Sequence, residues 1–467
     1  MNFSTLSFPG VLHDEVKAHL YPGDGFESAA ILLCSKAPEP RLRLLVKEVI
    51  RIPDGECQVR TPDFILWPGN YLERAIDLAE RDDLAIMLIH AHPGGLFAFS
   101  GTDDASDAAV VPTLFQALGT LHGTAIMTPD GAVRARVYDA NMRCSPVDLL
   151  TVAGHDLSFY WESDARLGEA TRRPMAFTSK MTAELGRLSA AVIGVSGTGS
   201  IAAEQVSRLG FGNVSLIDFD VVELRNLNRI LNSTLADAAS RRLKVHCFAE
   251  AVTDYRGPGV AFPFPVSIMT REAVLAASQC DVLFCCVDSL EGRQIADLIC
   301  SMFLIPMFDV GVTIPTRTTT DPAGVAVLDV CGRVDYVQPG RSTLKDRGVY
   351  SAESLRAEYV RNSLPENHQQ ELDEGYIKGV AEEAPSVITL NMRAASACVS
   401  EFIARAYPFR HDSNSRYART MFSLAACEEE YTAEDEFVVD DHSGLGRGAK
   451  EPLLGLPALA LPRGAKR

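Results

Sequence analysis

The sequence predicts an α/β chain in which an α+β domain precedes a Rossmann-like, doubly wound domain. The first observation behind this prediction is length, since 467 residues exceed the roughly 100–200 residues of an ordinary domain. The second is that the chain up to about Tyr138 alternates short apolar runs with Gly, Pro and Asp turns. The third is that strand and helix patterns alternate from Ser189 onward, which indicates a parallel sheet.

The elements of both domains follow from hydrophobic periodicity. In the first domain we expect strands at residues 29–34, 43–52, 85–90, 125–127 and 132–137, and helices at residues 70–81 and 105–121. In the second we expect strands at residues 190–193, 214–218, 282–287 and 306–310, and helices at residues 201–209, 271–278, 292–302 and 390–406.

Changes of composition divide the chain into four parts. We expect an N-terminal domain at residues 1–140, a connector without strand signals at 141–185, a nucleotide-binding domain at 186–427 and a tail at 428–467. The tail is first acidic and then rich in Gly, Pro and Leu, so we expect it to be flexible.

Charge and apolar patterning exclude several functional classes. The chain has 61 acidic and 44 basic residues, a net charge of −17, which disfavours general nucleic-acid binding. Its apolar runs are of strand length, below the roughly 18 residues of a membrane span, and no signal peptide is visible. The eleven cysteines form no Cys-x-x-Cys pair, which favours reduced thiols and a cytoplasmic location.

A His-x-His pair ends the predicted strand at residues 85–90. On a strand, His90 and His92 face the same way and can reach one metal ion. Asp103 follows after ten intervening residues, with Ser100 three before it, and Glu27 precedes the strand at residues 29–34. Two histidines and one aspartate suit Zn²⁺, and a further carboxylate suits a general base. A surface His-x-His and an acidic first helical turn remain the alternative interpretation.

A glycine-rich turn joins the predicted strand at residues 190–193 to the following helix. Gly194, Gly197 and Gly199 allow close approach of backbone to phosphate, and the helix N-terminus supplies N–H donors. Asp218 ends the next strand, where Rossmann-type folds place a ribose-binding carboxylate. A dehydrogenase, or a tight turn without a ligand, would also fit this pattern alone.

The first motif resembles the JAMM motif of JAB/MPN-type zinc isopeptidases. The resemblance covers residues 6–138 and rests on Glu27, His90, His92, Ser100 and Asp103. It implies that the two histidines and Asp103 ligate zinc. It also implies that Glu27 is the general base and that Ser100 stabilises the oxyanion. The implied reaction is cleavage after the C-terminal glycine of a ubiquitin-like protein.

The second motif is similar to that of the ThiF/MoeB/HesA family, the adenylation domain shared with ubiquitin-activating enzymes. The resemblance covers residues 173–407 and rests on the glycine-rich turn together with Asp218, Asp220, Asn226, Arg229, Lys244 and Asp288. It implies that Asp218 binds the ribose of ATP, with Asp220 in the same nucleotide site. Asn226, Arg229 and Lys244 would contact the phosphates. Asp288 would help to coordinate Mg²⁺, and the domain would form a homodimer.

Three positions depart from that family's pattern. Ser196 stands where a glycine is usual, and residues 339–343 lack the Cys-x-x-Cys of a structural zinc site. Residues 332–397 contain no cysteine for thioester formation. Cys331 and Cys398 flank this gap; we expect Cys398 to be a core residue, and Arg333 to favour a thiolate at Cys331 if that thiol is exposed.

The two motifs together predict a bifunctional, bacterial-type enzyme. The zinc domain would mature or remove a ubiquitin-like protein with a C-terminal Gly, and the second domain would activate that C-terminus with ATP and Mg²⁺. A separate conjugating enzyme is an expected partner. The alternatives are activation of a sulfur-carrier protein by thiocarboxylate formation and a non-catalytic scaffold that binds a ubiquitin-like tail.

Overall fold

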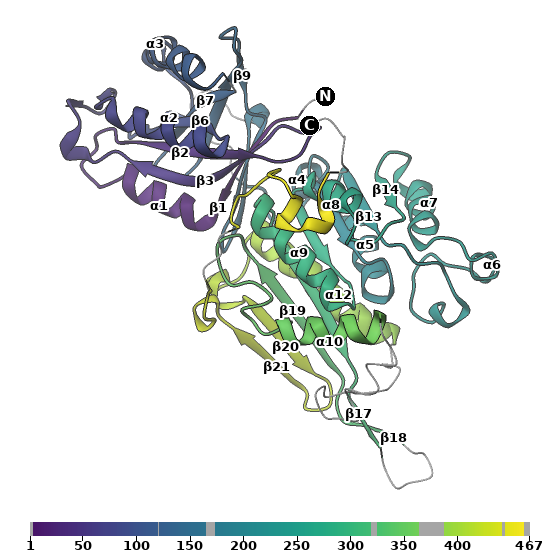
Figure 1. Ribbon diagram of the computed structural model, residues 1–467. Helices are drawn as coiled ribbons and strands as arrows, with labels where there is room; N and C mark the ends of the chain where they lie inside the picture. The colour runs from purple at the N-terminus through teal and green to yellow at the C-terminus, as the bar shows by residue number, and fades with distance from the viewer. Residues whose placement is uncertain are drawn as a thin grey trace. The chain divides into compact units, whose positions relative to one another are not determined.

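The computed structural model describes residues 3–119, 121–164, 173–318, 325–363, 387–440 and 444–461 (Figure 1). The chain divides into two compact units. The first unit comprises Met1–Arg173, Ser301–Leu304 and Ser443–Arg467, and the second comprises Pro174–Cys300 and Ile305–His442. The predicted α/β class is confirmed, and each unit is built on its own large sheet.

The first unit contains a nine-stranded mixed sheet with the strand order β11-β10-β1-β3-β2-β6-β7-β8-β9. Its strands are β1 (Thr5–Pro9), β2 (Ala29–Lys36), β3 (Arg43–Arg51), β6 (Ala85–Ala91), β7 (His122–Met127), β8 (Val133–Tyr138), β9 (Cys144–Pro146), β10 (Leu149–Ala153) and β11 (Leu157–Trp161). A separate small hairpin consists of β4 (Val59–Arg60) and β5 (Ile65–Leu66).

Helices cover both faces of this sheet. They are α1 (Gly10–Leu20), α2 (Asn70–Asp82) and α3 (Gly101–Leu118). Successive residues of β2 point to opposite faces, so Leu32 joins a core cluster with Val16 of α1, whereas Ile31 joins another with Ala75 of α2 and Leu114 of α3. Burial of both faces explains why β2 is almost continuously apolar.

Two expectations for the first unit need correction. Residues 141–185 are not a connector without strands, because β9, β10 and β11 extend the sheet and α4 (Ser179–Leu185) follows. The helix expected at residues 105–121 begins at Gly101, because Ser100 caps its N-terminus and accepts the N–H of Asp103.

The second unit contains an eight-stranded sheet with the order β14-β13-β12-β15-β16-β19-β20-β21. The first five strands are parallel and the last three join in antiparallel fashion. The strands are β12 (Ser189–Ile193), β13 (Asn213–Ile217), β14 (Ala261–Phe264), β15 (Val282–Cys285), β16 (Met307–Thr313), β19 (Cys331–Val337), β20 (Arg419–Ser423) and β21 (Glu428–Thr432). A two-stranded hairpin, β17 (Thr316–Thr318) and β18 (Val325–Val327), leaves the sheet after β16.

Besides α4, the helices of the second unit are α5 (Gly197–Leu209), α6 (Leu235–Ala239), α7 (Lys244–Arg256), α8 (Arg271–Ser278), α9 (Leu290–Phe303), α10 (Ala352–Ser363) and α12 (Ile388–Ala406). The predicted helices correspond to α5, α8, α9 and α12, whereas α4, α6, α7, α10 and the strand β14 were not predicted. The ring of Phe402 on α12 packs against Phe211, Phe284 and Phe308, with ring centroids 5.3–6.0 Å apart. Burial of these rings fixes α12 on the sheet.

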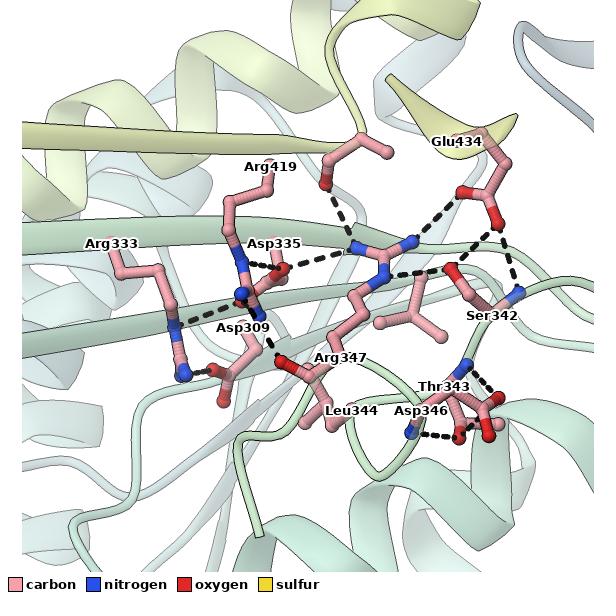
Figure 2. Close-up of polar contacts among 12 residues, drawn as sticks. Asp309, Arg333, Asp335, Ser342, Thr343, Leu344, Asp346, Arg347, Arg419 and Glu434 are labelled. Carbon is pink, nitrogen blue, oxygen red and sulfur yellow. Dashed lines mark hydrogen bonds and ion pairs between the residues drawn. The ribbon is translucent and has the colours of Figure 1, made fainter. Parts of the chain in front are cut away.

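A buried ion-pair network crosses the antiparallel strands (Figure 2). Asp335 is fully buried on β19 and accepts hydrogen bonds from Arg347 at 3.1 Å and Arg419 at 2.8 Å. Arg347 also donates to Glu434 at 2.9 Å and to Ser342 Oγ at 2.9 Å. Burial alone would raise the pKa of Asp335, but the surrounding arginines lower it. This network contains no cysteine. Through Ser342 it holds the stretch at residues 339–343, which lacks the Cys-x-x-Cys of a structural zinc site.

The expectation of a flexible tail at residues 428–467 is wrong for the part of it that the structure describes. Glu428–Thr432 forms β21, and Glu434 lies in the buried network. Leu453 and Leu459 are buried, and the N–H of Ala449 donates to the carbonyl of Lys36 at 2.8 Å. The apolar leucines, which composition alone suggested were tail residues, belong to the core. Among the described residues, no helix is both long and apolar enough to cross a membrane.

Candidate functional site

The end of β6 carries the paired histidines of the first unit. Pairing of Ala29 with His90 fixes the register, and the Nε2 atoms of His90 and His92 lie 3.1 Å apart. Nδ1 of His92 is 2.7 Å from the carbonyl oxygen of Leu96, so this nitrogen carries the proton and donates it. The lone pair on Nε2 is therefore directed toward the other site residues, as in a metal-binding histidine.

Asp103 brings a carboxylate to the two imidazoles. Its Oδ1 lies 3.0 Å from His90 Nε2, and its Oδ2 lies 3.5 Å from His92 Nε2. The backbone N–H of Ser100 donates to the same carboxylate at 2.5 Å. Burial would raise the pKa of Asp103, but the two histidines outweigh burial and hold it well below its usual range. Burial lowers the pKa of His92, and Asp103 and the Leu96 carbonyl reverse this so that the net shift is upward.

Glu27 completes the cluster from the segment that precedes β2. Ligand atoms of Glu27, His90 and His92 all lie within 4.8 Å of one another. Glu27 is buried, which raises its pKa against the lowering effect of both histidines. Two imidazoles, the Asp103 carboxylate and a nearby second carboxylate are a donor set that fits Zn²⁺ with a general base beside it. The structure thus brings together the metal and base residues named from sequence.

Ser100 and Tyr21 border this cluster. Ser100 is the N-cap of α3, and its Oγ accepts the N–H of Asp103; a hydroxyl that accepts in this way can also donate its proton. The hydroxyl of Tyr21 donates to the carbonyl of Met127, whose strand runs beside β6. Burial raises the pKa of Tyr21, so its hydroxyl remains protonated. No sequence pattern predicts that Tyr21 lies beside this cluster, because a single tyrosine after a helix has no recognisable spacing.

The glycine-rich turn of the second unit lies between β12 and α5. Gly194 has φ +84°, and a Cβ there would lie 3.0 Å from the backbone of Cys286. A Cβ on Gly199 would lie 1.7 Å from the carbonyl oxygen of Gly194. From the sequence, these glycines were expected to let the backbone approach phosphate. Contacts within the turn and with the end of β15 already require glycine at Gly194 and Gly199.

The N-terminus of α5 has no side-chain cap. Ser196 is the N-cap but makes no side-chain capping bond, because its Oγ accepts from Nζ of Lys244 at 3.1 Å. Nζ of Lys244 also donates to Asp220 at 2.8 Å. Ser196, which stands where the family usually has glycine, thus binds Lys244 through its side chain. An uncapped helix N-terminus beside a buried ammonium is an environment that suits phosphate.

Asp218 lies just beyond the C-terminal end of β13. Its carboxylate accepts the N–H of Val195 at 2.7 Å and the N–H of Asp220 at 2.8 Å, so it anchors the turn. Burial raises its pKa, although Lys244 and the two N–H groups act in the opposite direction. Because β12 pairs with both β13 and β15, their carboxyl ends form one edge of the sheet, the position at which doubly wound folds bind ligands.

Asn226 and Arg229 lie in the segment that follows β13, and Asp288 lies just after β15. Asn226 Oδ1 accepts the N–H of Glu223 at 3.2 Å and closes the 3-10 turn η3 (Leu224–Asn226) before Arg229. The guanidinium of Arg229 donates to the carbonyl of Arg225 at 2.9 Å. Asp288 is exposed beyond β15, and its carbonyl oxygen accepts from Arg293 at 3.4 Å.

Two ranges of the sequence match known protein families. Residues 171–407, just over half of the chain, match the ThiF family. The chain belongs to the ThiF family. Residues 10–138 match the family of prokaryotic homologs of the JAB domain, so the ThiF-family domain and a JAB-type domain occur in one chain.

Curated relatives resemble part of this ThiF-family chain. Ubiquitin-like modifier-activating enzyme 5 of Drosophila pseudoobscura pseudoobscura is 26% identical over 165 residues, which cover 32% of this chain and 37% of that enzyme. The enzyme of that name from Oryza sativa subsp. japonica is 30% identical over 167 residues, covering 33% and 36%. The chain thus spans little more than a third of these relatives. Among solved structures, E. coli MccB with succinimide gives a TM-score of 0.42 at 13% identity, covering 57% of this chain and 69% of MccB.

The two cysteines that flank the cysteine-free stretch of this ThiF-family chain are poorly suited to act as nucleophiles. Cys398 is fully buried, which raises its pKa strongly. Burial and a hydrogen bond to Asp329 raise the pKa of Cys331 to about 11. The expectation that Arg333 favours a thiolate at Cys331 is wrong, because the Arg333 guanidinium pairs with the carboxylates of Asp309 and Asp335.

Two further residues at the ThiF-type site were missed from sequence. A Cβ on Gly197 would lie 2.3 Å from Nδ2 of Asn391, so this amide of α12 lies against the glycine-rich turn. Glu358 of α10 accepts the N–H groups of Leu290 and Glu291, at 3.1 and 2.9 Å, and caps α9 just after Asp288. Both contacts join segments that are far apart in the sequence, so no local spacing predicts them.

Proposed function

We propose that this chain is a bifunctional enzyme acting on a ubiquitin-like protein with a C-terminal glycine. Its ThiF-family domain would adenylate the glycine carboxylate, and its JAB-type domain would hydrolyse the bond that follows the glycine in a precursor or conjugate. The observation that carries the proposal is the convergence of Glu27, His90, His92 and Asp103 in a chain that also belongs to the ThiF family.

In the hydrolytic reaction, His90, His92 and Asp103 would hold Zn²⁺. The ion would supply Lewis acidity that activates water and polarises the scissile carbonyl. Glu27 would take the proton of the attacking water and return it to the departing amine, for which its buried position beside the histidines is suited. The Ser100 hydroxyl would donate to the developing oxyanion.

In adenylation, the glycine carboxylate attacks the α-phosphorus of ATP, an acyl–phosphate bond forms, and pyrophosphate leaves. Lys244, Arg229 and the N-terminal amides of α5 would neutralise the phosphates. Asn226 would contact a phosphate through its amide group, Asp218 would bind the ribose, and Asp288 would help to hold Mg²⁺.

The acyl-adenylate then needs a nucleophile. Cys331 is mostly protonated near neutral pH and Cys398 is buried, so we propose that an external group attacks the adenylate. The thiol of a separate conjugating enzyme would give a thioester. A sulfur donor would give a thiocarboxylate, which is the second candidate function. We further propose a cytoplasmic enzyme that pairs with a second copy of itself.

The cleavage test uses a ubiquitin-like protein extended by a short peptide after its terminal glycine. The purified chain should release the peptide and contain about one zinc per chain. Glu27→Gln should retain the metal and lose cleavage by roughly 10²–10⁴-fold, because only the base is removed. Undiminished cleavage in this variant would contradict the assigned role.

The adenylation test measures ATP–pyrophosphate exchange with the same protein trimmed to its free glycine. Exchange should require both the trimmed protein and Mg²⁺, and Glu27→Gln should leave it unchanged. Failure of exchange under these conditions would favour a non-catalytic scaffold. Thiocarboxylate on the trimmed protein, with no amide conjugates, would favour the sulfur-carrier function.

A further inference from the structure

The segment that carries Glu27 has little conformational restriction of its own. In the described chain, residues 21–28 belong to no helix or strand. Gly23 and Gly25 have φ +100° and +77°, and open space surrounds the position of a Cβ on either. Glycine loses more backbone freedom on ordering than any other residue, so contacts from elsewhere must fix this segment.

The β4–β5 hairpin supplies such contacts to the backbone of Glu27. The N–H of Glu27 donates to the carbonyl of Thr61 at 2.8 Å. The carbonyl of Glu27 accepts from Nε of Arg60 at 2.9 Å. Both main-chain polar groups of Glu27 are therefore held by two consecutive residues at the end of β4.

Arg60 also binds the residues on either side of Glu27. Its Nη1 donates to Asp24 at 2.9 Å, and its Nη2 donates to the hydroxyl of Ser28 at 2.9 Å. Its side chain is only 14% exposed. The carbonyl of Ser28 in turn accepts the N–H of Ala91, which lies between the two site histidines on β6. One guanidinium thus connects the base-bearing segment to the strand that carries the metal-type ligands.

We propose that Arg60 is a positioning residue that sets the place of the Glu27 carboxylate relative to His90 and His92. This inference rests on the proposed hydrolytic function of the JAB-type domain. The planar fork of guanidinium N–H groups reaches three acceptors on one segment at once. A lysine ammonium at the same position cannot reproduce that pattern, and misplacement of a reacting group by about 1 Å is sufficient to cost about 10²-fold in rate.

Two measurements on the full chain test the proposal. The first is hydrogen–deuterium exchange of peptides covering residues 24–30 in metal-free protein, which does not depend on catalysis. Arg60→Ala should raise exchange of these amides at least tenfold, and Arg60→Lys should raise it by less. The second is peptide cleavage by zinc-loaded protein, in which Arg60→Ala should lower kcat ten- to a hundredfold with KM and zinc content unchanged. Added guanidinium ion should restore part of the lost kcat.

Arg143→Ala is the matched control, since that side chain is 75% exposed and pairs with Asp139 on the surface. It should leave both measurements unchanged. Exchange of residues 24–30 that stays at the wild-type rate in Arg60→Ala would overturn the proposal. If Arg60→Ala does not fold, Arg60→Lys decides in its place, and wild-type kcat in that variant would overturn the proposal. Absence of cleavage by the wild-type chain would refute the proposed function, and the exchange measurement would still decide the role of Arg60.

Discussion

The candidate sites of the two units are assembled in different ways. In the JAB-type domain the chemical groups touch one another: one carboxylate, that of Asp103, reaches both imidazoles. In the ThiF-family domain Asp218 and Asp288 follow the separate parallel strands β13 and β15, and Arg229 is bonded to its neighbour Arg225, whereas Lys244 at the start of α7 contacts Asp220 and Ser196. We therefore expect substitutions at the JAB-type site to have interdependent effects. At the ThiF-type site, the effects of substituting separate residues should be closer to additive.

The sharpest test of this difference is at the nucleotide-type site. Arg229→Ala and Asp288→Ala should each lower ATP–pyrophosphate exchange by about 10²–10³-fold, because each removes charge stabilisation at the phosphates or magnesium. Neither should change the thermal midpoint by more than a degree or two, since Asp288 is exposed and the hydrogen bonds of Arg229 to described residues are to its neighbours Arg225 and Asn228. Full exchange activity in either variant would contradict the assignment of the site.

The contrasting experiment removes the shared carboxylate of the metal-type site. Asp103→Asn should lower zinc affinity by about 10–100-fold or more, because both histidines lose their common partner. In metal-free protein the pKa of His92 should fall, because Asp103 contributes to raising it. NMR titration of the histidine ring protons checks this sign, and a pKa that stays in place would show that the two groups act separately.

The buried network across the antiparallel strands of the ThiF-family domain should affect stability rather than chemistry. Glu434→Gln leaves Arg347 with one carboxylate fewer in a buried position, which we expect to cost about 3 kcal/mol of unfolding free energy. Denaturant unfolding measures this loss. The exposed Glu429 on β21 supplies the control, since Glu429→Gln should change stability by less than about 0.5 kcal/mol. Equal losses of unfolding free energy in the two variants would show that the buried Glu434 contributes no more to stability than an exposed glutamate.

The smallest effect is expected at Cys331. Cys331→Ala should leave transfer of the adenylated ubiquitin-like protein to an external nucleophile unchanged, because the raised pKa of about 11 keeps the Cys331 thiol mostly protonated near neutral pH. Alkylation of Cys331 should accordingly accelerate only as pH rises toward that value, as peptide mass spectrometry can follow. A thiol-sensitive adduct with the ubiquitin-like protein that disappears in Cys331→Ala would assign the nucleophile to this chain.

Short-range patterns account for what could be predicted from sequence. His90, His92 and Asp103 lie within 14 positions of one another, and the glycine-rich turn is continuous, so strand parity and loop spacing were enough. The alternation of β12, α5 and β13 was predicted for the same reason.

Long-range contacts account for what was missed. β1 pairs with β10 far along the chain, and β4 and β5 have only two residues each, too short to show a period. Glu434 was assigned to a tail because local composition does not reveal that it binds a buried arginine. Arg60 is likewise one arginine among many until the fold brings it to Glu27.

The pairing of β1 with β10 has a consequence for the order in which the chain is made. Thr5 of β1 meets Leu149 of β10, so more than a hundred residues must be synthesised after β1 before its outer edge is covered. During that interval β1 presents an open parallel edge, which is a place for mispairing between nascent chains. A recombinant JAB-type domain cut at residue 140 would keep that edge permanently open, whereas one extended past Trp161 would close it with β10 and β11.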